Sequence, residues 1–192
     1  MDYLDRVKDI NRKFDLLLKY GQKILLECPT KMQRVLKSFI SNIMSLKKSG
    51  SDPFIKYENL IKIFINQENL LEELLDFILI SDENCDASII HRRIELHLDK
   101  LAEENKKDTD SKYSTIESIT NLIKNKKYQN KIDRNYVLML FKMHNFTVGI
   151  VTLSEIMELR QELLSIYMDN HNYDKIINIC ENFGRVVIKF LP

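Results

Sequence analysis

The sequence repeats a short motif, and this repeat limits the folds that the chain can adopt. His144-Asn145-Phe146 returns as His171-Asn172-Tyr173, and a helical apolar pattern follows each copy. An offset of about 27 residues is what two short helices and two turns require at a rise of about 1.5 Å per residue. We therefore expect a stacked array of helices, in which the aromatic residue after each turn packs under the preceding helix. Gly184 follows the second copy, where a left-handed helix C-cap would fit.

Composition favours long helices and argues against several classes of protein. The chain has 192 residues, of which 30% are charged and 44% apolar, with four glycines and three prolines. This composition is typical of a folded protein, and so few turn-forming residues argue against an all-β fold. A formal net charge of +1 disfavours nucleic acid binding. Uncharged apolar runs such as Phe77 to Ile80 are too short to cross a membrane, and the N-terminus lacks an apolar signal region.

Apolar residues recur at three- and four-residue steps along most of the chain, which predicts a series of amphipathic helices. Leu75 belongs to a stripe that is wide enough to be covered by two neighbouring helices. Asn66 is expected to cap the N-terminus of the helix that contains Leu75. Residues 103–112 contain no apolar residue, so we expect a mobile loop there. The expected helices before the repeat cover about residues 3–27, 30–47, 57–65, 67–80, 87–102, 114–127 and 133–142. The predicted fold is an all-α solenoid of antiparallel helix pairs that forms one segment over residues 1–192.

The four histidines do not form a recognisable metal site. His91 and His97 are six residues apart, which places them on different faces of a helix, and neither has an Asp or Glu at zinc-binding spacing. We expect histidines at the surface or in turns, with His144 and His171 bonded to helix ends. No metal or other cofactor is predicted.

The cysteines, methionines and one lysine cluster also have structural interpretations. Cys28, Cys85 and Cys180 are far apart and form no CxxC pair, which argues against a disulfide framework or a zinc site. Cys180 stands at helical spacing from two isoleucines, so we expect it in the core rather than as a nucleophile. A lysine cluster is expected to complement a solvated helix C-terminus, and five methionines to fill gaps between helices. These residues are Lys124, Lys126 and Lys127, and Met32, Met44, Met139, Met143 and Met168.

A run of residues near the C-terminus carries a resemblance to a known family. The run comprises Met143, His144, Asn145, Phe146, Gly149, Leu153, Glu155, Leu159, Gln161, Met168, Tyr173, Ile177, Cys180, Glu181 and Gly184. Without any gap, it resembles the clathrin-heavy-chain-type repeat of the vacuolar protein sorting-associated protein 11 family. Weaker matches precede it at Lys19-Tyr20-Gly21, Pro29 and Ile94-Glu95-Leu96, so the resemblance covers most of the chain. It departs at Ser154, where the family usually has an aromatic residue, and at Tyr167, which lies one position late.

The resemblance implies a protein-interaction scaffold without catalysis. The family is a class C core subunit of the HOPS and CORVET complexes, which bring endosomal and vacuolar or lysosomal membranes together before fusion. The implied partners are the other protein subunits of such a complex, and the implied location is cytoplasmic, peripheral on those membranes through partners. In the family a β-propeller precedes this region and a RING-type zinc domain closes the chain, and we expect neither in these 192 residues.

Two alternatives remain open at this point. A clathrin-like coat or another helical-repeat interaction module would share the repeat type. A small helical enzyme that uses His91, His97 or Cys180 is the alternative from a different class.

Overall fold

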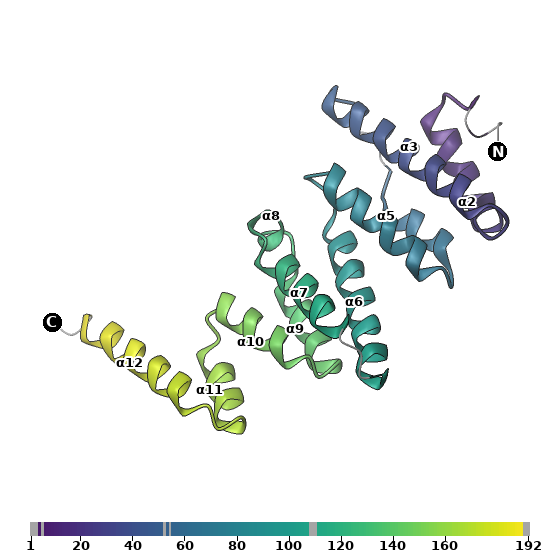
Figure 1. The fold of residues 1–192 in the computed structure, drawn as a ribbon. Coiled ribbons are helices and arrows are strands. Elements are labelled where there is room, and N and C mark those ends of the chain that lie inside the picture. Colours follow the sequence, from purple (N-terminus) through teal and green to yellow (C-terminus); the bar gives the residue numbers. More distant parts are fainter. Residues whose placement is uncertain (1–3, 5, 52, 54, 108–110, 190–192) are drawn as a thin grey trace. The chain divides into compact units, whose positions relative to one another are not determined.

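The computed structural model shows a helical chain (Figure 1). It describes residues 4, 6–51, 53, 55–107 and 111–189, excluding the side chains of residues 107 and 182–189. Within these ranges the regular secondary structure consists of α-helices and one 3-10 helix, so the all-α prediction is confirmed. Contacts divide the chain into two compact units. Unit 1 contains Met1–Lys100 and Asn125–Ile132, and unit 2 contains Leu101–Lys124 and Asp133–Pro192.

Unit 1 is built from helices packed around an apolar core of aliphatic and aromatic side chains. α2 packs against α3 and the 3-10 helix η1, and α3 packs against α5. Leu75 is 0% exposed, as its position in a wide apolar stripe predicts. At Gly21 an added Cβ would lie 3.0 Å from Ile63 Cγ2, so the missing side chain lets η1 approach α2 closely. The elements are α2 (Ile10–Glu27), α3 (Pro29–Lys48), α4 (Glu58–Ile61), η1 (Lys62–Phe64), α5 (Glu68–Ser81), most of α6 (Ala87–Lys107) and α8 (Lys126–Gln129).

Unit 2 contains a regular series of short helices. α9 (Arg134–Met143), α10 (Thr147–Ile156), α11 (Arg160–Asp169) and α12 (Tyr173–Lys189) begin thirteen residues apart. α10 packs against α9, α11 and α7 (Ser111–Lys124), and α11 packs against α12. Successive helices joined by tight turns are what a solenoid of helix pairs requires.

Several predicted boundaries differ from the structure. The helix expected over residues 3–27 is interrupted, since residues 7–9 are not helical and α2 begins at Ile10. Asn66 does not cap α5, because it adopts a left-handed φ of 60° and Gln67 occupies the N-cap position. Most of the loop predicted at residues 103–112 is helical. α6 continues to Lys107 and α7 begins at Ser111, while residues 108–110 lie outside the described part.

The polar composition of the segment at residues 103–112 was misleading because Glu and Lys have high helix propensity. A helix that is already formed by the apolar residues of α6 can therefore extend through them. Glu104 is 8% exposed, so even this polar segment contributes to a buried face. That residues 1–192 form one continuous solenoid segment stays a prediction.

Candidate functional site

The three turns that connect α9 to α12 share one geometry. In each turn a non-glycine residue adopts a left-handed conformation: Asn145 at φ 52°, Glu158 at φ 56° and His171 at φ 53°. The N–H of the following residue donates to a carbonyl five residues back, with Phe146 N to Phe141 O at 2.8 Å as the first case. The other two bonds are Leu159 N to Ser154 O at 2.9 Å and Asn172 N to Tyr167 O at 2.8 Å. This hydrogen-bond pattern is the Schellman motif, which ends a helix and satisfies its last carbonyls.

The shared turn geometry corrects the register of the sequence repeat. The left-handed residues are thirteen positions apart, so Asn145 corresponds to His171 at a spacing of 26 residues. The offset of 27 that the repeated motif suggests is therefore one residue too long. Phe146 corresponds structurally to Asn172, and Tyr173 falls on the first position of its helix. As a result Phe146 is 5% exposed, as predicted, while Tyr173 is 65% exposed, and the prediction that it packs under the preceding helix is wrong.

An aromatic cluster supports the first turn and explains one glycine of the family motif. The rings of Phe141 and Phe146 meet edge to face, with centroids 5.2 Å apart. A Cβ at Gly149 would lie 2.3 Å from Phe146 Cδ1 and 2.9 Å from Phe141 Cδ2. Only glycine leaves room there for both rings. Leu153, one turn further along α10, is 1% exposed and continues the same core.

The second half of the motif lies largely on the surface. Ile177 is 54% exposed, and Cys180 and Glu181 are also exposed. The prediction that Cys180 packs in the core is therefore wrong. Helical spacing shows that residues share a face but not that a neighbour covers it. Gly184 lies inside α12 and not at its end, so the predicted C-cap is also wrong.

Other motif residues and methionines are exposed as well. Met143 is 69% exposed, and His144 and Glu155 are exposed. Met32 and Met44 are buried, as the gap-filling prediction requires. That prediction is wrong for the three exposed methionines, which are Met139, Met143 and Met168.

A shallow hollow of about 210 Å³ lies beside α11 in unit 2. Tyr167 lines it, and the Tyr167 hydroxyl donates to Glu155 Oε1 at 3.2 Å. Lys175 Nζ lies 5.0 Å from the Tyr167 ring centroid. The further lining residues are Leu163, Asn178 and Ile179. The tyrosine that stands one place later than in the family is thus a buried, bonded residue, and sequence gave no sign of its partner Glu155.

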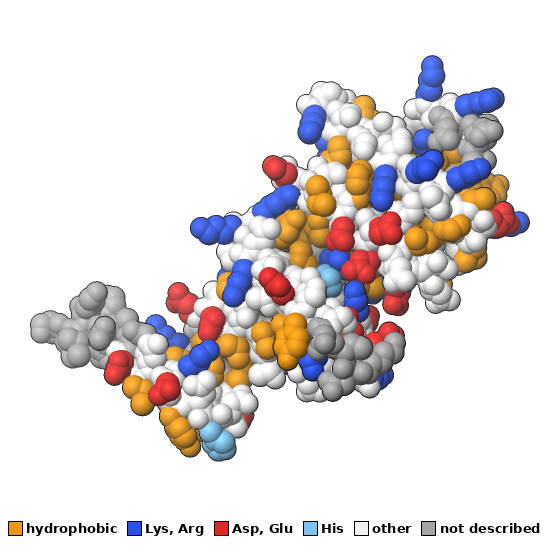
Figure 2. All heavy atoms as spheres, in the orientation of Figure 1, with side chains coloured by type: hydrophobic (Ala, Val, Ile, Leu, Met, Phe, Trp, Pro, Cys, Tyr) orange, Lys and Arg blue, Asp and Glu red, His pale blue; other side chains and the backbone are white. Residues whose placement is uncertain are grey.

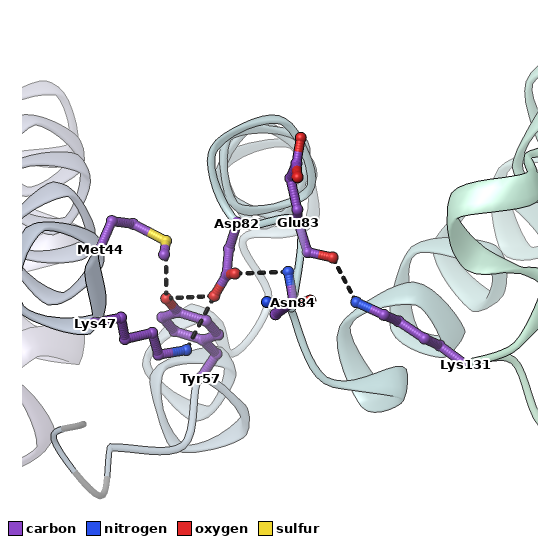
Figure 3. Close-up of polar contacts among 7 residues, drawn as sticks. All are labelled: Met44, Lys47, Tyr57, Asp82, Glu83, Asn84 and Lys131. Atoms are coloured by element: carbon purple, nitrogen blue, oxygen red, sulfur yellow. Dashed lines mark hydrogen bonds and ion pairs between the residues drawn. The ribbon is translucent and has the colours of Figure 1, made fainter. Parts of the chain in front are cut away.

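A buried carboxylate at the end of α5 organises the polar contacts of unit 1 (Figure 3). Asp82 accepts hydrogen bonds from Lys47 Nζ at 3.0 Å, Tyr57 Oη at 3.1 Å and Asn84 N at 2.8 Å. Burial alone would raise the pKa of Asp82, but the bonds from Lys47 and the Asn84 amide outweigh it and hold that pKa below its usual value. Burial, together with the Asp82 charge, raises the pKa of Tyr57 far above its usual value. The sequence showed none of this network.

Three further side chains, from a distant part of the chain, bond to carbonyls at the end of α5 and in the turn after it. The Leu79 carbonyl accepts from Lys127 Nζ at 3.1 Å and from Tyr128 Oη at 3.2 Å, and Lys131 Nζ donates to the Glu83 carbonyl. Cations near the last carbonyls of a helix complement its dipole. The prediction of a solvated lysine cluster is therefore wrong for Lys127, which caps another helix.

Arg93 and His97 form a second buried polar group, between α6 and α5. Arg93 is 6% exposed and binds Asp76 through two bonds of 2.7 and 3.0 Å, and Glu72 at 2.7 Å. His97 is 5% exposed, so the expectation of surface histidines is wrong for it. Burial, helped by the Arg93 charge, lowers the pKa of His97 to about 4.

Metal chemistry finds no support among these side chains. The described residues contain no group of three His, Cys, Asp or Glu side chains that could hold a metal ion. His91 is half-buried and lies on the same helix as His97. The structure therefore presents helix faces, turns and buried polar contacts as its notable features.

Comparison with known proteins assigns the chain to a family. The model of the family described as the PEP5/VPS11 clathrin repeat matches residues 1–190. The chain belongs to the PEP5/VPS11 clathrin repeat family. It is 28% identical to the vacuolar protein sorting-associated protein 11 homolog of Dictyostelium discoideum over 128 residues, which are 66% of this chain and 13% of that protein. It is 25% identical to the Mus musculus and Homo sapiens homologs over 171 residues, which are 86% of this chain and 18% of each relative.

The PEP5/VPS11 relatives are much longer than this chain, which spans less than a fifth of their length. No solved structure matches the chain. The resemblance inferred from the motif residues is confirmed by the family match. Membership of a helical-repeat family points to a scaffold rather than an enzyme. Among the described residues, the helices are all too short or too polar to cross a membrane.

Proposed function

We propose that this PEP5/VPS11 repeat chain is a non-catalytic scaffold segment of a membrane-tethering complex of the HOPS/CORVET type. Under this proposal it works in vesicle-mediated protein transport at endosomes and at the vacuole or lysosome. The observation that carries the proposal is the match of the family model to residues 1–190. The names of the relatives, all vacuolar protein sorting-associated protein 11 homologs, support it.

The repeated turns suit a spacer with a defined shape. Each turn from α9 to α12 has the same left-handed residue and the same backbone bond, so successive helices are joined by the same geometry. Buried polar networks at Asp82 and Arg93 fix helix pairs in unit 1 through charged hydrogen bonds. A segment of this kind would hold other parts of a tethering protein at set positions and present helix faces to other subunits of the complex. Its association with membranes would be peripheral.

A chimera tests the proposal directly. This chain would replace the matching segment of the Dictyostelium discoideum homolog, in cells that lack the native protein. We expect the chimera to coprecipitate the other class C subunits and to restore delivery of a vacuolar hydrolase. The control is the same chimera with Leu75→Asp, which places a charge at a fully buried position and should fail in both measurements.

The same experiment separates the tethering function from its alternatives. A clathrin-like coat module would coprecipitate coat proteins instead of class C subunits. A folded chimera that recovers neither set of proteins, and leaves the hydrolase secreted, would contradict the proposed function.

A further inference from the structure

Charge is unevenly distributed within unit 1, although the whole chain is nearly neutral. Residues 6–48, which include α2 and α3, contain eleven Lys or Arg and three Asp or Glu. Residues 68–100 contain three Lys or Arg and nine Asp or Glu. Figure 2 shows Lys and Arg side chains gathered over α2 and α3 on the face in view. A net charge of +1 thus hides a local concentration of cations.

The cations of α3 fall into two groups that face different surroundings. Lys37 and Lys47 lie on the side of α5, where Lys37 Nζ is 3.7 Å from Glu73 and Lys47 Nζ is 3.0 Å from Asp82. Other cations of α2 and α3 are exposed, on the side away from the apolar core. We call this surface the α2–α3 basic face; it comprises Arg12, Lys19, Lys23, Lys31 and Arg34.

The other exposed residues of these two helices are mostly polar or apolar, and two on α2, Asp15 and Glu27, are acidic. On α3 the exposed positions after Arg34 are Ser38, Ser41, Asn42, Ser45 and Lys48, without a carboxylate. On α2, Leu26 is 61% exposed, Leu18 39% and Tyr20 46%. Lys19 Nζ lies 5.2 Å from the Tyr20 ring centroid. The surface therefore combines an excess of cations over carboxylates with serines and a few protruding apolar side chains.

We infer that the α2–α3 basic face binds the anionic lipid headgroups of a membrane surface. Clustered Lys and Arg are attracted to anionic leaflets, and Leu and Tyr side chains can enter the headgroup region beside them. On α2 the cations extend from Arg12 to Lys23, about 17 Å at 1.5 Å per residue, and Lys31 and Arg34 of α3 add to them, as suits a broad charged plane. The cores of protein–protein interfaces are instead depleted in Lys and Ser.

The acidic part of unit 1 sets the orientation of this contact. α5 packs against α3, and the carboxylates of Glu73 and Asp82 pair with Lys37 and Lys47 on that side of α3. An anionic membrane would attract the basic face and repel residues 68–100, which favours a single approach. The same carboxylates disfavour a long polyanion such as RNA, which would extend beyond two helices. The contact requires no other subunit, so it can be measured independently of the proposed function.

Vesicle sedimentation of the 192-residue chain tests the inference. We expect the chain to bind phosphatidylcholine vesicles that contain about one-third phosphatidylserine, and not vesicles of phosphatidylcholine alone. Binding should weaken as salt is raised, because exposed charges are screened. The double variant Lys31→Gln/Arg34→Gln should lose about 25-fold in affinity, at about fivefold for each cation near the surface.

A matched variant controls for net charge and folding. Lys106→Gln/Lys126→Gln removes two exposed cations outside the basic face and should bind as the parent chain does. Circular dichroism should show the same helix content for both variants, since all four residues are exposed. The inference is overturned if the chain ignores anionic vesicles, binds neutral vesicles equally well, or is weakened equally by both variants. Binding only to an acidic peptide or to RNA would overturn it too.

Discussion

Gly149 shows how a single residue can oppose the usual preference of a helix. In an ordinary helix interior, Ala is more stable than Gly by about 0.5–1 kcal/mol. At Gly149 the added methyl group would lie 2.3 Å from a Phe146 ring atom. We therefore expect Gly149→Ala to lower the free energy of unfolding by about 1–3 kcal/mol, as overpacking does. Urea denaturation followed by circular dichroism measures this change.

A double-mutant cycle checks the cause of that loss. Adding Phe146→Leu removes the ring that Gly149→Ala would strike, so the alanine should cost less in the Leu background. If Gly149→Ala stabilises the chain, or costs the same in both backgrounds, the contact with Phe146 is not the reason for the glycine.

Glu158 occupies a left-handed conformation that suits it poorly. For L-residues other than Gly, Asn and Asp this conformation costs about 1–2 kcal/mol, and Glu158 has a φ of 56°. Glu158→Gly removes this conformational cost, but glycine also loses more conformational entropy on folding. We therefore expect Glu158→Gly to raise the free energy of unfolding by about 0.5–1 kcal/mol. Thermal unfolding would show a raised Tm. Glu158→Ala removes the same charge but keeps a Cβ, and an equal gain from it would assign the effect to charge.

His97 makes stability depend on pH between neutrality and pH 5. Its folded pKa is about 4, below the value of about 6.5 expected when unfolded. In that interval the unfolded chain binds more protons, so stability falls as pH falls, by about 2 kcal/mol between pH 7 and pH 5. Urea denaturation at several pH values should show this slope. His97→Gln should flatten it, while a slope unchanged by the substitution would assign it to other groups.

At the scale of elements, Asp82 joins parts that are distant in the chain. It connects Lys47 of α3, Tyr57 before α4 and the turn after α5. Asp82→Ala leaves the half-buried Lys47 and the buried Tyr57 hydroxyl without this acceptor, so we expect a loss of about 2–4 kcal/mol in unfolding free energy. Glu83→Ala, at the exposed neighbouring position, removes a carboxylate but keeps the backbone contacts, so it is the control and should change little. Equal losses in urea denaturation would show that the Asp82 contacts add no stability.

The positions of the helices were easier to predict than the burial and the partners of their side chains. Apolar spacing located most elements, including α3 and α5, because each buries a stripe of its own side chains. The same spacing placed Cys180 in the core, and the repeated motif placed Tyr173 there, but both side chains are exposed in the described part of the chain. It also missed Asp82 and Arg93, whose partners come from other elements. Periodicity reports on one helix, while burial and ion pairing depend on a second one.

The turns show a related limit. The similarity of His144-Asn145-Phe146 to His171-Asn172-Tyr173 correctly indicated repeated helices. Backbone geometry sets the true register, however, through the left-handed residues Asn145, Glu158 and His171. Glu158 belongs to the same series although nothing in its identity indicates a turn. Chemical similarity therefore located the repeat but not its period.

At the scale of the whole molecule, two compact units should respond separately to damage in their cores. Stability in helical arrays is a sum of local terms, so a defect acts mainly on its neighbours. Leu75 in unit 1 is 0% exposed and Leu153 in unit 2 is 1% exposed. Replacing either residue by Asp therefore puts a charge into the core of one unit only. Leu75→Asp should cost several kcal/mol, because the carboxylate is buried without a partner.

Hydrogen exchange shows which helices lose stability in each variant. We expect Leu75→Asp to speed amide exchange in α2, α3 and α5 while α9, α10 and α11 keep their protection, and Leu153→Asp to give the opposite pattern. The two variants control for each other, since they introduce the same side chain. Uniform loss of protection from either variant would mean that the chain unfolds as one cooperative body. Segregated loss would mean that each unit holds its own core, as an array of helix pairs requires.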